Sequence, residues 1–167
     1  MARGRGNSKR DRFLSTRPQC GFETSDIGKK CSFNFSYFSP AYGGQDLEVW
    51  ANENGSASLQ SLFDKLVQFT NEPLSYWESQ RAGAGSLKVL AYYSEFPKRC
   101  KFQMPPSVPH DARWGRFRLG NKVRLAGFSV PTNLNGQQDK DGNLLDKNIF
   151  YVVYLDKDHE FYPVEAD

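Results

Sequence analysis

The chain has no apolar run that approaches the roughly 18 residues a helix needs to cross a bilayer. Its first residues, MARGRGNSKRDRFLSTRP, are basic and are not followed by the apolar segment of a secretory signal. Cysteine is scarce: Cys20, Cys31 and Cys100 are an odd number at irregular spacing, which argues against a disulfide framework or a zinc site. These absences predict a cytoplasmic protein with reduced thiols and no membrane segment.

Several catalytic signatures are also missing. The sequence has no Gly-rich phosphate loop, no G-x-S-x-G elbow, no C-x-x-C pair and no H-E-x-x-H helix. There are only two histidines, His110 and His159. The local group Asp156, Asp158 and His159 has no second cluster at ligand spacing, so we expect no metal and no cofactor.

Large side chains, in contrast, are plentiful. The 167 residues include 13 Phe, 8 Tyr and 3 Trp, and the length fits a single domain with a well-filled core. Residues 1–30 are rich in Gly, Arg, Ser and Lys and show no periodicity. We therefore expect a basic, disordered tail over residues 1–30 and one domain over residues 31–167.

Periodicity predicts both helices and strands in this domain. Aromatic residues alternate with small polar ones over residues 31–38, which is typical of a strand with one buried face. Apolar residues recur at three- and four-residue steps over residues 59–69, which predicts an amphipathic helix capped by Ser56 or Ser58. Pro73 suits the first turn of a second helix, so the two helices would form a hairpin.

The remaining sequence indicates a sheet. Residues 87–93 and two runs within residues 113–128, on either side of a Gly-Asn turn, predict three strands. The segment NIFYVVYL, residues 148–155, is continuously apolar and predicts a strand covered on both faces. We therefore expect an α+β fold, with a twisted antiparallel β-sheet of four or five strands and a helical hairpin packed on one face.

The charges are segregated along the chain. Residues 1–17 hold six Lys/Arg against one Asp, and residues 98–124 hold eight against one Asp. Residues 41–80 hold six acids against one Lys, and residues 146–167 hold six acids against two Lys. A basic block within the folded region is typical of a surface that binds a polyanion such as nucleic acid, although solvated faces also carry such blocks.

Four cations of this block come from neighbouring predicted strands. Alternation places Arg116 and Arg118 on one face of the first strand, and Lys122 and Arg124 on one face of the next. A sheet face with several cations can hold phosphate groups, and arginine can bind a phosphate through two hydrogen bonds. Arg113, at the start of the first run, adds to the same basic block. An ordinary exposed hairpin would have the same pattern.

Aromatic rings and a histidine accompany these cations. Single-stranded RNA is commonly held by base stacking beside basic groups, and Trp114 and Tyr154 are the candidate rings. His159 follows a strand end, where an imidazole with a free pKa of roughly 6.5 can act as general acid or base. Asp156 and Asp158 flank it and could orient or charge it. The alternative is a solvent-exposed turn histidine.

The segment 113–163 resembles RelE-type toxins, small bacterial ribonucleases of toxin–antitoxin pairs. RFRLGNKVRLAGF is similar to their paired strands of the pattern R-x-R-x-G-x-x-R, and FYVVYLDKDHEFY to their apolar strand with a closing His/Arg…Tyr segment. The resemblance implies proton transfer by His159 and orientation of RNA by Tyr162. It implies that three arginines bind and polarise phosphate: Arg116, Arg118 and Arg124.

We therefore expect an RNA-binding, metal-free endoribonuclease of toxin or phage-defence type. Its partners would be RNA or ribosome-bound mRNA and a protein antitoxin or other protein. The candidate catalytic residues are His159, Arg124 and Arg118. The candidate nucleic-acid-binding residues are Arg116, Lys122, Arg113, Trp114, Tyr154 and Tyr162. The alternative is a non-catalytic module that binds nucleic acid or protein through the same basic sheet face, with the acidic hairpin contacting a second protein.

Overall fold

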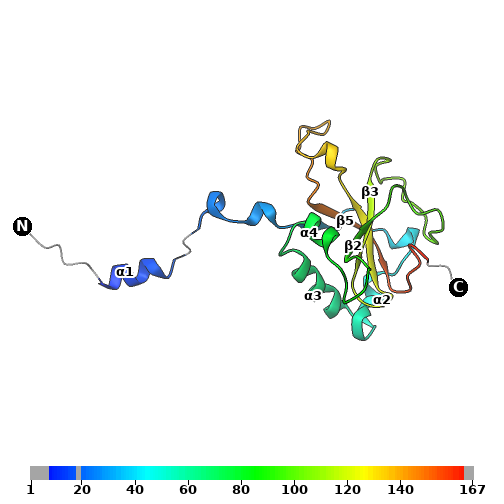
Figure 1. The fold of residues 1–167 in the computed structure, drawn as a ribbon, viewed down its shortest axis with the longest axis horizontal. Helices are drawn as coiled ribbons and strands as arrows, with labels where there is room; N and C mark the ends of the chain where they lie inside the picture. The colour runs from blue at the N-terminus through cyan, green and yellow to red at the C-terminus, as the bar shows by residue number, and fades with distance from the viewer. Residues whose placement is uncertain (1–7, 18–19, 164–167) are drawn as a thin grey trace, which may run out of the picture.

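The computed structural model describes residues 8–17 and 20–163, which include one five-stranded sheet (Figure 1). Strands β2 to β5 form an antiparallel meander, and β1 pairs in parallel with β5 at one edge. The α+β class is confirmed, and the sheet is mixed because the first strand lies beside the last and runs in the same direction. The strands are β1 (Ser32–Asn34), β2 (Leu90–Tyr92), β3 (Arg113–Arg118), β4 (Arg124–Ser129) and β5 (Ile149–Asp156).

The helical hairpin is present. Helix α3 (Leu59–Phe69) is capped by Ser58, whose hydroxyl accepts a hydrogen bond from the Ser61 backbone N–H at 3.1 Å. Helix α4 (Leu74–Ser79) follows Pro73. A short helix, α2 (Leu47–Ala51), precedes them and was not predicted, because five residues are too few to show a periodicity. No helix in the described parts of the chain has the length and apolar content to span a membrane.

The hairpin covers one face of the sheet. Leu62, Leu66 and Phe69 of α3 and Trp77 of α4 are buried in one cluster with sheet residues such as Phe117. We call this the helix-side cluster. Phe69 and Phe117 stack with ring centroids 4.6 Å apart, so the helix is fixed directly on β3.

The other face is covered mainly by irregular chain. Phe102 and Val108 of the Pro-rich connection pack with Trp114, Tyr154 and Phe161 in a second cluster, which we call the loop-side cluster. Tyr154 and Phe161 are fully buried. The connection therefore takes the place of a helical layer, and β5 is covered on both faces as its apolar sequence predicts.

The pairing of β4 with β5 contains a bulge. Gly127 lies opposite Val152 and Ala126 opposite Tyr154, which leaves Val153 without a partner. A Cβ atom on Gly127 would lie 2.0 Å from the Tyr151 carbonyl oxygen, so only glycine fits there. After the bulge, Asp156 lies directly opposite Arg124.

The predicted first strand is shorter than its aromatic pattern indicates. Only residues 32–34 pair with β5, and the Asn34 side chain then accepts a hydrogen bond from the Ser36 N–H at 2.8 Å as the chain turns away. Phe33 packs on the helix-side cluster, whereas Tyr37 packs on the loop-side cluster. The expectation that these rings share a face is wrong, because the chain passes from one face of the sheet to the other.

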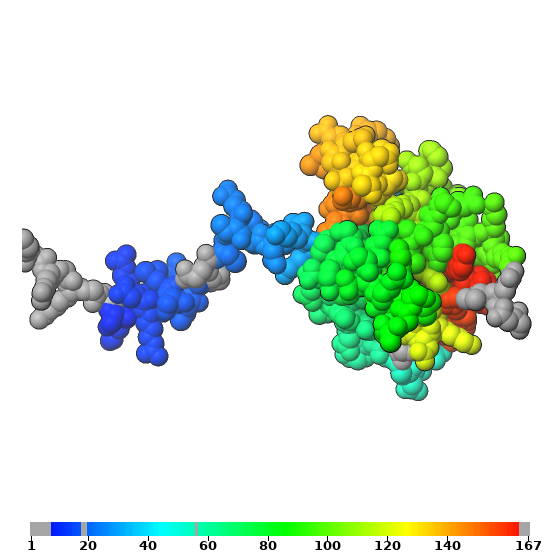
Figure 2. Space-filling view, viewed as in Figure 1, coloured from blue at the N-terminus to red at the C-terminus, as the bar shows by residue number. Residues whose placement is uncertain are grey.

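The N-terminal arm carries helix α1 (Ser8–Ser15), in which no residue is buried. Two 3-10 turns, Phe22–Thr24 and Ile27–Lys29, connect it to the domain. Figures 1 and 2 show α1 standing well away from the sheet. The expected tail over residues 1–30 thus includes regular turns, and residues 1–7 and 18–19 lie outside the described residues.

Candidate functional site

Three arginines project from one face of the β3–β4 hairpin. Arg118 lies directly opposite Arg124, so both side chains are on the same face, and Arg116 shares it two residues earlier on β3. This is the face of the loop-side cluster, at the end where the hairpin turns. Like charges placed opposite one another are unfavourable in a sheet. The arrangement is therefore costly unless an anion binds there.

A tight turn after β5 delivers His159 to these arginines. The buried Asp156 carboxylate accepts hydrogen bonds from the backbone N–H of Glu160 at 2.9 Å and of Phe161 at 3.0 Å. Phe161 is itself fixed in the loop-side cluster. Between these anchors His159 has φ 65°, the one positive φ of a non-glycine residue in the described chain. Asp156 thus holds the backbone that carries the histidine, not its ring.

The imidazole of His159 contacts an arginine. The Nη1 group of Arg116 donates a hydrogen bond to Nε2 of His159. A guanidinium can only donate, so Nε2 must be unprotonated and the ring neutral, with its proton on Nδ1. The ring is half-buried. A neutral imidazole is the form that accepts a proton in general-base catalysis. Its Nε2 lone pair is available for that role when Arg116 turns from the ring to a bound phosphate.

Electrostatics keep this ring neutral. Burial, followed by the charges of Arg116, Arg124 and Arg118, lowers the pKa of His159 to about 4. Burial and the two neighbouring arginines also lower the pKa of Arg124 to about 10. Each group disfavours further positive charge nearby. The site is therefore a cluster of three positive charges with a neutral base at its edge.

The arginines lack anionic partners. Within residues 8–17 and 20–163, none of Arg116, Arg118 and Arg124 forms an ion pair with a carboxylate. Arg118 donates to the Asn121 carbonyl, and Arg124 donates to the carbonyls of Gly120 and Val123. The Nε atoms of Arg118 and Arg124 are buried without a partner. Because buried donors are normally satisfied, these two atoms indicate a ligand oxygen or water.

A cavity opens at this cluster. Its volume is about 490 Å³, and its lining includes the three arginines, His159 and Lys122. A deeper recess of about 40 Å³ is bordered by the same three arginines. Lys122 reaches the cavity from the hairpin loop rather than from β4. In Figure 2 the loop between β3 and β4 lies beside the segment that ends at Pro163, as the cavity lining requires.

Two tyrosines lie beside the cluster. Tyr162 stacks on Tyr93 with centroids 4.8 Å apart, and the Arg116 guanidinium lies 5.5 Å from the Tyr162 ring centre and 6.0 Å from that of Tyr93. Tyr162 is 44% exposed. Tyr93 escaped the sequence reasoning because the register that sets it beside Arg116 depends on pairing between distant strands.

The other candidate residues lie elsewhere. Arg113 is at the opposite end of β3, where it pairs with Glu78 at 2.8 Å and lies over Tyr92. Trp114 is 3% exposed and Tyr154 fully buried in the loop-side cluster, so neither ring can receive a base in this conformation. Both rings are part of the core. Their burial could not be predicted, because the connection 94–112 that covers them has no periodic pattern to indicate where it packs.

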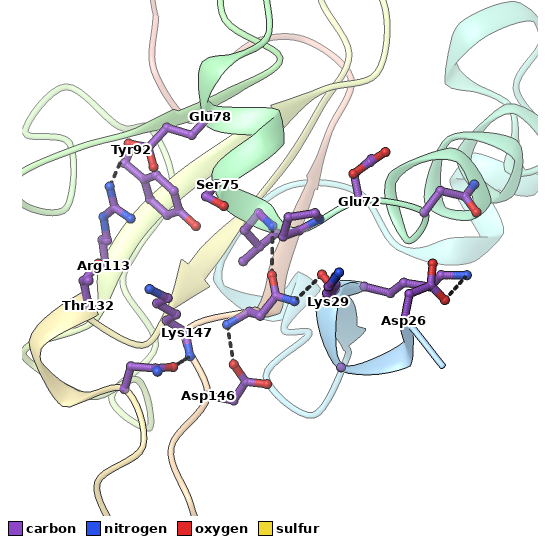
Figure 3. A pocket seen from close by; sticks show the side chains of 17 residues that line it. Asp26, Lys29, Glu72, Ser75, Glu78, Tyr92, Arg113, Thr132, Asp146 and Lys147 are labelled. Carbon is purple, nitrogen blue, oxygen red and sulfur yellow. Dashed lines mark hydrogen bonds and ion pairs between the residues drawn. The ribbon is translucent and has the colours of Figure 1, made fainter. Parts of the chain in front are cut away.

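A larger hollow, of about 710 Å³, lies near Arg113 (Figure 3). Its lining mixes acids and bases, and two of its charged pairs, Arg113–Glu78 and Lys30–Asp26, neutralise each other. Asn148 connects three segments there: it accepts from the Leu74 N–H at 2.8 Å and donates to the Lys29 carbonyl at 3.1 Å. Figure 3 draws the side chains that line the hollow, with their hydrogen bonds and ion pairs as dashed lines. The hollow is thus a structural junction with balanced charge, unlike the arginine cavity.

No group of three or more His, Cys, Asp or Glu side chains in the described chain is arranged to hold a metal ion. Comparison with known proteins finds no matching family model, curated protein or solved structure. The resemblance of residues 113–163 to RelE-type toxins therefore stays a prediction.

The state of His159 can be measured directly. With only two histidines in the chain, imidazole NMR signals can be assigned by comparison with His110→Gln. We expect His159 to titrate with a pKa of about 4. This pKa should rise when inorganic phosphate binds, because the anion offsets the arginine charges. An unperturbed value near 6.5 with no response to phosphate would contradict this arrangement. His110 is exposed and provides the internal control.

Proposed function

We propose that this chain binds single-stranded RNA through the arginine cluster and cleaves it without a metal, with His159 as the proton-transfer residue. The observation that carries the proposal is the contact between neutral His159 and one of three arginines that have no carboxylate partner. A phosphodiester is an anion that these donors can bind, and its ribose carries a hydroxyl that a neutral imidazole can deprotonate.

The reaction follows from these positions. His159 takes the proton of the ribose 2′-hydroxyl, the 2′ oxygen bonds to phosphorus, and the bond from phosphorus to the 5′ oxygen breaks. The imidazolium then donates its proton to the leaving 5′ oxygen, which yields a 2′,3′-cyclic phosphate and a 5′-hydroxyl. Arg118 and Arg124 stabilise the charge on the non-bridging oxygens. A bound phosphodiester also raises the pKa of His159 toward the range where general-base catalysis is efficient.

The neighbouring rings favour single-stranded RNA as the substrate. The exposed Tyr162 is backed by Tyr93 and held beside Arg116, so a base adjacent to the bound phosphate can stack on it. In a duplex the bases stack on one another and are not free to do so. Lys122 and Arg116 extend the positive surface along the backbone.

The biological setting of the proposal rests on the resemblance to RelE-type toxins. In that setting the chain is a cytoplasmic toxin or phage-defence nuclease that acts on free RNA or ribosome-bound mRNA and is held inactive by a protein antitoxin. Expression of the chain alone would then stop bacterial growth, and expression of a catalytically inactive variant would not.

Incubation of the purified chain with total RNA, and with ribosomes carrying mRNA, in EDTA tests the proposal. We expect cleavage that leaves cyclic-phosphate and 5′-hydroxyl ends. The 5′-hydroxyl is identified by direct phosphorylation with a polynucleotide kinase, and the cyclic phosphate by its resistance to ligation at the 3′ end. RNA that is retained by the protein but stays intact in both samples would instead support the non-catalytic binding module. RNA that is neither bound nor cut would reject both.

A further inference from the structure

Helix α3 presents two large apolar side chains to solvent. Phe63 is 57% and Val67 is 65% exposed, and their four-residue spacing makes them neighbours on the helix surface. The opposite side of the same helix supplies Leu62, Leu66 and Phe69 to the helix-side cluster. Phe63 and Val67 are therefore not needed for the core of the domain, and they leave an apolar patch uncovered.

Exposed acids lie on α3 and on the segments next to it. Asp64 lies on α3 itself, Glu72 follows the helix, and Glu48 lies on α2, which packs against α3. All three are exposed, and none forms an ion pair within the described residues. Two further acids of this region are already neutralised, Glu53 by Lys157 and Glu78 by Arg113. The patch therefore suits an apolar segment that carries positive charge.

Such a segment exists in the same chain. Helix α1 has the sequence SKRDRFLS, contains no buried residue and exposes Phe13 by 58% and Leu14 by 43%. Its adjacent apolar residues can cover the apolar pair of α3, and its flanking cations can pair with the acids on and next to α3. Figures 1 and 2 show α1 extended away from its own domain, apart from the sheet and from α3.

We infer that the face of α3 formed by Phe63 and Val67 is the docking surface for α1 of a second copy of this chain. Phe13 and Leu14 cover the apolar pair, and Lys9 and Arg12 face the acids around it. Residues 16–30 separate α1 from Cys31, which is fixed by a hydrogen bond from its N–H to the Glu72 carbonyl. With its two 3-10 turns kept, a segment of this length spans roughly 40 Å, enough to reach a neighbouring molecule.

Reciprocal docking gives a closed dimer. Each copy contributes one arm and one α3 face, so two identical contacts form about a two-fold axis and no open chain results. Each contact is small and partly ionic, so the dimer depends on protein concentration and weakens with salt. This inference is independent of RNA cleavage.

Sedimentation equilibrium of the full, RNA-free chain at several concentrations tests the inference. We expect a reversible dimer that is weakened about tenfold or more by Phe13→Ser and equally by Phe63→Ser, since each removes an aromatic anchor from the same contact. Leu144→Ser is the matched control, because Leu144 is 70% exposed in a loop outside both surfaces. It should leave the dimer unchanged.

A mixture of the two variants identifies the exchange. Neither variant alone has an intact contact, but a heterodimer has one, formed by Phe13 of the Phe63→Ser chain and Phe63 of the Phe13→Ser chain. The mixture should therefore dimerise more strongly than either variant. A monomer at every concentration would overturn the inference. So would a dimer sensitive to Phe63→Ser but not to Phe13→Ser, which would indicate direct contact between two α3 helices.

Discussion

Replacement of His159 by alanine is expected to slow RNA cleavage by roughly 10²–10⁴-fold, the usual contribution of a general acid–base group. RNA affinity should change little, because the ring is neutral and the phosphate is bound by the arginines. Single-turnover cleavage and fluorescence anisotropy with a labelled oligonucleotide separate the two quantities.

The second histidine of the chain provides the control. His110 is exposed in the Pro-rich connection and is not among the residues that line the arginine cavity, so His110→Ala should cleave at the wild-type rate. If His159→Ala cleaves as fast as His110→Ala, His159 is only a turn residue. In that case the arginine cavity binds RNA without cleaving it.

Replacement of Asp156 by alanine is expected to lower the free energy of unfolding by about 3 kcal/mol, because two backbone N–H groups lose their charged acceptor. Cleavage should fall as well, because the turn no longer holds His159 beside Arg116. Urea unfolding and single-turnover cleavage measure the two effects. Asp146 gives a matched control: its carboxylate also accepts a backbone hydrogen bond, from Asn148 at 2.7 Å, but it is exposed.

We expect Asp146→Ala to cost no more than about 1 kcal/mol and to leave cleavage intact. A further readout distinguishes positioning of the histidine from simple loss of stability. In Asp156→Asn the NMR pKa of His159 should rise from about 4 toward its ordinary value as the ring moves away from the arginines. Equal stability of Asp156→Ala and Asp146→Ala would show that the turn is held by other contacts, such as the burial of Phe161.

Sequence patterns were sufficient for the elements whose side chains repeat regularly. Helix α3 shows about three turns of apolar spacing with a serine cap, and β5 shows an unbroken apolar run; both were located within a few residues. Strand β1 was predicted too long and helix α2 was missed, because elements of three and five residues are too short to show a period and depend on contacts made far away in the chain.

The candidate site shows the same division. Arg116, Arg118 and Arg124 could be grouped because alternation within one hairpin fixes which face they share. Trp114 and Tyr154 look from the sequence like rings available to a base. Their burial depends on how the connection 94–112 packs, and its four prolines give no regular signal. Tyr93 likewise meets Tyr162 only in the folded chain.

Because Val153 has no partner on β4, the alternation of side chains between the two faces of β5 changes at this residue. Before it, odd-numbered residues such as Tyr151 face the loop-side cluster; after it, even-numbered residues such as Tyr154 and Asp156 do. Without the bulge, the alternation would direct Leu155 toward the arginines and bury the Asp156 carboxylate against the helices. The bulge thus exchanges the faces of all later residues of β5, and this exchange decides on which side of the sheet the turn that carries His159 lies.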